Sequence, residues 1–102
     1  QMIIYIISSI EHNNDNMYKI GYSYKSPSIL LEYYNEIIPN PYYLLQYYIK
    51  DEHVNDTINI MENIFDELYR HYVYKNSNSM WVKMELADLI TRFNNKYVPI
   101  YY

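Results

Sequence analysis

A single glycine limits the ways in which this chain of 102 residues can fold. Gly21 lies in segment 17–23, Met-Tyr-Lys-Ile-Gly-Tyr-Ser, where large apolar side chains alternate with the others as they do in a β-strand. Glycine is needed where φ is positive, or where another group comes close to the backbone. We therefore expect a notch in a strand. It is either a bulge or gap filled by neighbouring side chains, or the floor of a polar site.

The composition is that of one globular domain, which we place at residues 2–102 with Met2 as the expected natural start. Half of the residues are hydrophobic and 20% are charged, and a chain of this length can bury one core. The chain has no cysteine, which excludes disulfides and thiolate metal sites and fits a reducing, intracellular compartment. No apolar run approaches the roughly 18 residues of a membrane span, so no membrane association is expected. The first residues lack the shape of a signal peptide.

The net charge of −4 argues against a broad basic surface for nucleic acid, although a small local one remains open. The 16 tyrosines accompany many asparagines and isoleucines, a usage typical of an AT-rich genome. A tyrosine is therefore informative only where its position supports a role.

The hydrophobic pattern predicts an α+β domain, in the order β-β-α-β-α-α, with a small three-stranded antiparallel sheet flanked by helices. The predicted strands are 2–8, 17–23 and 42–49, and 80–84 is a further short strand or extended segment. A polar turn at 11–16 joins the first two strands into a hairpin. The predicted helices are 27–37, 55 or 56 to 72, and 85–95. Segment 75–79 is expected to be a loop, and the pattern assigns no structure to the tail from 96.

Each predicted helix has an apolar stripe that should face the sheet. The residues expected in these stripes are Ile29, Leu30, Tyr33, Tyr34 and Ile37, then Ile58, Met61, Phe65, Leu68 and Tyr72, then Leu86, Leu89, Ile90 and Phe93.

Few side chains offer familiar chemistry. One glycine cannot make a phosphate-binding loop, and the three histidines lack the spacing of metal ligands. Glu62 follows Met61, about 100° round the helix, and so lies at the edge of the apolar stripe. An edge carboxylate can reach over the sheet to hold a hard cation such as Mg²⁺. The alternative is an ordinary solvated acid on an amphipathic helix.

The order of the motifs resembles the GIY-YIG superfamily of nucleases, especially the branch of large DNA viruses and phages that carries Lys-Ile-Gly in its second motif. The resemblance runs from Ile3 to about Lys83. The matching segments are Ile3-Ile4-Tyr5, Tyr18-Lys19-Ile20-Gly21-Tyr22-Ser23, Leu30-Leu31-Glu32-Tyr33-Tyr34, Pro39-Asn40-Pro41, Glu62 within 61–65, and Met80-Trp81-Val82.

The resemblance implies metal-dependent phosphodiester hydrolysis of DNA, or of RNA, by a viral protein in the host cell. It assigns catalysis to Tyr5, Tyr18 and Lys19, and a single Mg²⁺ or Mn²⁺ to Glu62. It assigns substrate binding to Gly21, Ser23 and Tyr33.

Two departures from the family pattern leave the function open. Ile3 replaces the glycine of the first motif, and Tyr33 stands where the family has a phosphate-clamping arginine. A phenol cannot replace the two-pronged contact of a guanidinium. The chain is therefore either a weakened endonuclease or a catalytically degenerate module. Such a module would bind nucleic acid or protein, or form a homodimer through a tyrosine-rich surface.

Overall fold

The computed structural model describes residues 2–75 and 78–97, with side chains as far as Asn94. Its centre is a five-stranded sheet in the order β3-β1-β2-β5-β4, in which all neighbouring strands are antiparallel. The strands are β1 (Met2–Ser8), β2 (Met17–Ser23), β3 (Tyr42–Ile49), β4 (Tyr72–Lys75) and β5 (Ser79–Lys83).

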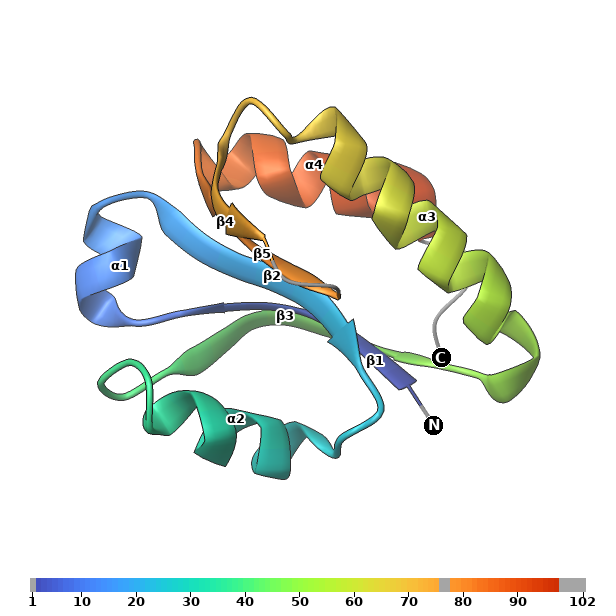
Figure 1. The fold of residues 1–102 in the computed structure, drawn as a ribbon, viewed down its shortest axis with the longest axis horizontal. Helices are drawn as coiled ribbons and strands as arrows, with labels where there is room; N and C mark the ends of the chain where they lie inside the picture. Colours follow the sequence, from blue (N-terminus) through green and yellow to red (C-terminus); the bar gives the residue numbers. More distant parts are fainter. Residues whose placement is uncertain (1, 76–77, 98–102) are drawn as a thin grey trace.

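Helices cover the two faces of the sheet unequally. They are α1 (Ile10–Asn14), α2 (Pro27–Asn35), α3 (Val54–Glu67) and α4 (Leu86–Tyr97), with a short 3-10 helix at Asp51–His53. Figure 1 shows α2 on one face, α3 and α4 on the other, and α1 at the end of the β1–β2 hairpin. We call these the α2 face and the α3 face.

Strand alternation divides the core into two clusters. All seven residues of β1 are buried. Ile3, Tyr5 and Ile7 pack toward α2, against Leu30 and Tyr34. The residues between them belong to the larger cluster on the α3 face, which is completed by side chains of α3 and α4 such as Met61, Phe65, Leu89 and Phe93.

The predicted α+β class is confirmed, and strands 2–8, 17–23 and 42–49 have the predicted bounds. The predicted turn at 11–16 is wrong in part, because a short helix occupies most of it. Ser9 caps this helix, since its Oγ accepts a hydrogen bond from the backbone N–H of His12 at 3.2 Å. Asn16, with a φ of 56°, then turns the chain into β2.

The three-stranded sheet is also wrong, because β4 and β5 extend it to five strands. The apolar pattern places Tyr72 in the long helix, but α3 ends at Glu67 and Tyr72 begins β4. All four residues of β4 are exposed, so the strand carries no alternating pattern that could reveal it. Pairing with β5 decides its structure. The last predicted helix is confirmed with slightly shifted bounds, and the tail beyond residue 97 lies outside the described residues.

Of the five residues predicted to face the sheet from helix 27–37, two do so. Leu30 and Tyr34 are buried, but Ile29, Tyr33 and Ile37 are 54%, 51% and 57% exposed. Only a narrow stripe of this nine-residue helix touches the sheet, because no second helix of the described residues packs beside it on that face. Across residues 2–75 and 78–97, no helix combines the length and apolarity needed to cross a membrane.

Candidate functional site

The notch at Gly21 is filled by the chain itself. A Cβ atom there would lie 2.7 Å from the Asn78 carbonyl oxygen, 2.7 Å from the Tyr5 hydroxyl and 2.8 Å from the Ser79 Cβ. The φ of Gly21 is not positive, so the glycine is required for space and not for backbone conformation. The groups that come close to this backbone are Tyr5, Ser79 at the start of β5 and Asn78 just before it. Of the two possibilities that the sequence leaves open, the structure therefore shows a gap filled by neighbouring groups of the chain.

Tyr5 forms a buried hydroxyl pair with Tyr34 beneath the notch. The two oxygens are 3.1 Å apart, and Tyr5 is 2% exposed. Burial, and then the neighbouring Tyr34, raise the pKa of Tyr5 far above its usual value. Tyr5 is therefore a neutral phenol at physiological pH. It can donate or accept a hydrogen bond, but it does not supply a phenolate as a base.

A small polar pocket of about 170 Å³ opens beside this pair. Its lining consists of Tyr5, Tyr22, Ser23, Lys25, Leu30, Tyr33, Tyr34, Asn78 and Ser79. Tyr33 stands half exposed with its ring edge-on to Tyr34, at 5.2 Å between centroids. Ser23 Oγ accepts a hydrogen bond from the Lys25 N–H at 3.0 Å, which fixes the turn that presents Lys25.

Lys19 lies on the same face and is 3% exposed. Its Nζ is 5.9 Å from the ring centroids of Tyr34 and Tyr74, and 5.7 Å from that of Trp81. His12 stacks on Trp81 at 4.8 Å. No ion pair joins Lys19 to a carboxylate within residues 2–75 and 78–97. Burial lowers the pKa of the Lys19 amine, because the charged form loses hydration that the three rings replace only in part.

Tyr18 lies on the other face from Lys19, because successive side chains of a strand point in opposite directions. It is 1% exposed in the core of the α3 face, and its hydroxyl donates to Asn13 Oδ1 at 3.0 Å. The structure therefore does not bring Tyr18 together with Tyr5 and Lys19. Its hydroxyl instead ties β2 to α1.

Glu62 also lies on the α3 face. Its carboxylate accepts a hydrogen bond from the Tyr22 hydroxyl at 3.3 Å and is 3.7 Å from Lys75 Nζ. The resemblance groups Glu62 with Tyr5 and Lys19 in one site, but the structure does not bring them together, because the sheet separates them. Lys75 lies where a cation would approach Glu62, and the expected Mg²⁺ or Mn²⁺ site stays a prediction. Among the described residues, no group of three histidine or acidic side chains is placed to hold a metal ion.

The structure thus brings together five of the predicted site residues on the α2 face: Tyr5, Lys19, Gly21, Ser23 and Tyr33. No sequence motif gave a role to Lys25, Asn78 and Ser79, which line the same pocket. Lys25 lies two residues beyond Ser23 of the second motif, and this closeness in the sequence could have indicated that Lys25 belongs to the site. Asn78 and Ser79 gave none, because only the pairing of β5 with β2 brings them to Gly21.

Comparison of the chain with models of protein families, with curated proteins and with solved structures finds no match. Membership of the GIY-YIG superfamily therefore stays a prediction that rests on the motifs.

Proposed function

We propose that this chain is a nucleic-acid-binding module of the nuclease type that binds a phosphate on its α2 face without hydrolysing it. The observation that carries this proposal is the charge of Lys19, which has no carboxylate partner among the described residues. Lys19 is almost fully buried, and its Nζ lies 5.9 Å from the centroid of the Tyr34 ring, which lines the polar pocket. Buried charges in proteins are usually paired, because an isolated one loses its hydration. A phosphate group bound from outside would provide the missing counter-charge.

The surroundings of Lys19 support an anion as the ligand. Lys25, Ser23 and Asn78 supply donors at the pocket, and the half-exposed ring of Tyr33 offers a surface on which a base can stack. The described residues that line the pocket include no carboxylate. A local site of this kind is compatible with a chain whose overall charge is −4.

Hydrolysis lacks its expected parts. Tyr5 stays neutral, Glu62 lies across the sheet, and a tyrosine takes the place of the clamping arginine. Electrostatic stabilisation of the transition state usually contributes more to such catalysis than any other effect, and one missing donor costs about 100-fold or more in rate. Binding without cleavage is therefore the function that this geometry supports best.

A binding assay tests the proposal. Fluorescence anisotropy is measured with a labelled 20-nucleotide single strand, the corresponding duplex and the RNA of the same sequence, between 20 and 200 mM salt. Because the proposed site holds one phosphate, the logarithm of the duplex association constant should fall with a slope of about −1 against the logarithm of the salt concentration. Lys25→Gln should reduce the magnitude of that slope. Lys75→Gln, which removes the same charge from the α3 face, should leave it unchanged.

The absence of binding to all three probes at 100 µM protein and 20 mM salt would refute the proposal. Hydrolysis is tested separately by nicking of supercoiled plasmid with Mg²⁺ or Mn²⁺. We expect wild type and Glu62→Gln to leave the plasmid equally intact. Nicking by wild type that Glu62→Gln abolishes would instead establish the endonuclease.

A further inference from the structure

Strand β4 forms an exposed edge of the sheet at the side away from β3. It is bonded to β5 alone among the described residues, so its outer backbone groups are open. Three of its side chains, Tyr72, Val73 and Tyr74, are 48%, 57% and 55% exposed. Tyr69, at the end of α3, is 57% exposed beside them. We call these four residues the β4 patch.

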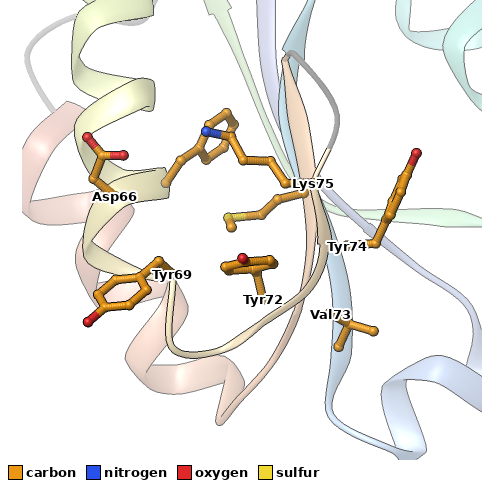
Figure 2. A pocket seen from close by; sticks show the side chains of 8 residues that line it. Asp66, Tyr69, Tyr72, Val73, Tyr74 and Lys75 are labelled. Carbon is orange, nitrogen blue, oxygen red and sulfur yellow. The ribbon is translucent and has the colours of Figure 1, made fainter.

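This edge lacks the outward-facing charged side chains that usually prevent edge strands from pairing with other chains. Lys75 is the one charged residue of β4. It turns back toward α3, where its Nζ lies 3.7 Å from Glu62 and 5.3 Å from the centroid of Phe65. Figure 2 shows Tyr72 and Lys75 directed toward α3, while Val73 and Tyr74 point away from it. The strand therefore presents apolar surface on both sides and no charge along its outer edge.

A cavity of about 430 Å³ lies behind the edge, between α3 and β4. Its lining consists of Phe65, Asp66, Tyr69, Tyr72, Val73, Tyr74, Lys75 and Met80. The volume is ample for an aromatic side chain, and the lining includes one acid, Asp66 on α3, and one base, Lys75 on β4.

The charges favour a second copy of this chain as the occupant. The region around the β4 patch carries two acids, Glu62 and Asp66, and three bases, Lys19, Arg70 and Lys75, so its charges nearly balance, whereas the whole chain has a net charge of −4. A two-fold interface places a surface against itself, so a balanced region is the one through which two acidic chains can meet with the least repulsion.

The exposed area indicates how strong such a contact is. An aromatic side chain buries roughly 150–250 Å², so the exposed halves of three tyrosines and a valine come to about 400 Å². A standard interface takes about 800 Å² from each partner. The strand backbone and the end of α3 would add to the 400 Å², which corresponds to a weak dimer that depends on concentration.

We propose that β4 pairs antiparallel with β4 of a second copy, so that the two sheets become one. A two-fold axis perpendicular to the sheet keeps both α3 helices on the same side. Tyr69 and Tyr72 of each copy then lie against the cavity of the other. This contact is on the opposite side of β4 from β5 and uses none of the residues that line the phosphate pocket. Tyr74 is shared with the proposed function, because its ring centroid lies 5.9 Å from Lys19 Nζ, so the dimer is tested without nucleic acid.

Sedimentation velocity without nucleic acid tests the dimer. We expect the wild type to pass from monomer to dimer between about 5 and 500 µM, the range of weak interfaces. Val73→Lys places a charge on the edge and should raise the dissociation constant at least tenfold. Ile29→Lys is the matched control, because it adds the same charge to an equally exposed β-branched residue on α2. It should leave the constant unchanged.

A circular-dichroism melt confirms that each variant folds. If Val73→Lys does not fold, Tyr69→Lys takes its place, since Tyr69 lies outside the sheet. A wild type that stays monomeric at 500 µM would overturn the proposal and would indicate that the patch binds a different partner. An edge variant that dimerises as the wild type does would also overturn it. So would an Ile29→Lys variant that no longer dimerises.

Discussion

Replacing Gly21 with alanine should strongly destabilise the fold, because the notch has no room for a methyl group. The new Cβ would meet three atoms at 2.7–2.8 Å, and one of them is a backbone carbonyl oxygen that cannot rotate away. Overpacking of this kind costs about 1–3 kcal/mol, and disturbing the bond between Tyr5 and Tyr34 adds about 1 kcal/mol. Alanine also lowers the conformational entropy of the unfolded chain, which offsets about 0.5–1 kcal/mol of this destabilisation. We expect a net loss of about 1–3.5 kcal/mol, with a central value of about 2 kcal/mol.

Urea unfolding followed by circular dichroism measures this loss, and for a domain of this size the melting temperature should fall by about 10–20 °C. A double-mutant cycle with Tyr5→Phe identifies the cause. Phenylalanine removes the hydroxyl that the methyl group would strike, so Gly21→Ala should cost about 1 kcal/mol less in the Tyr5→Phe background than in wild type.

A change of less than 0.5 kcal/mol in the free energy of unfolding of Gly21→Ala would refute this account, since it would mean that the notch is open and available to a ligand. If Gly21→Ala is strongly destabilising but its effect is the same in wild type and in Tyr5→Phe, the Tyr5 hydroxyl does not contribute to the steric clash.

The tyrosines around the notch give three more expected outcomes. Tyr34→Phe leaves the Tyr5 hydroxyl without its partner and should lower the free energy of unfolding by about 1–2 kcal/mol in urea titrations; an unchanged value would deny the pair any structural role. Burial raises the pKa of Tyr43 to about 12 and that of Tyr5 further, so above pH 10 the unfolded state ionises while the folded state keeps its protons. Stability should then fall by about 1.4 kcal/mol per pH unit for each group, and Tyr5→Phe should show a shallower fall between pH 10 and 11.5 than wild type. Tyr33→Arg adds a cation to a half-exposed position, so the melting temperature should stay within about 3 °C while DNA affinity rises several-fold; a large drop in melting temperature would contradict the exposure of Tyr33.

The sequence alone determined the first three strands and the presence of α2, α3 and α4. Strands β1 and β2 could be predicted because burial selects the apolar side chains that most of their positions carry. The short polar link between them allows them to pair only as an antiparallel hairpin. The sole glycine also marked a real constraint, since its position in a strand pattern implied a close approach. These features depend on residues near one another in the chain, which is why they could be predicted.

Tertiary structure decided which groups share a face and what fills the notch. Tyr18 and Lys19 are adjacent in sequence but lie on opposite sides of the sheet, and Glu62 belongs to the side of Tyr18. The position of Glu62 beside the apolar stripe of its helix indicates that the acid lies near the sheet. It does not indicate which face of the sheet the helix covers. Strand β4 has no pattern of its own, and it exists because β5 offers it backbone hydrogen bonds. That pairing of distant segments creates the exposed edge, because the hydrogen bonds of a sheet join residues by position in space and not by type.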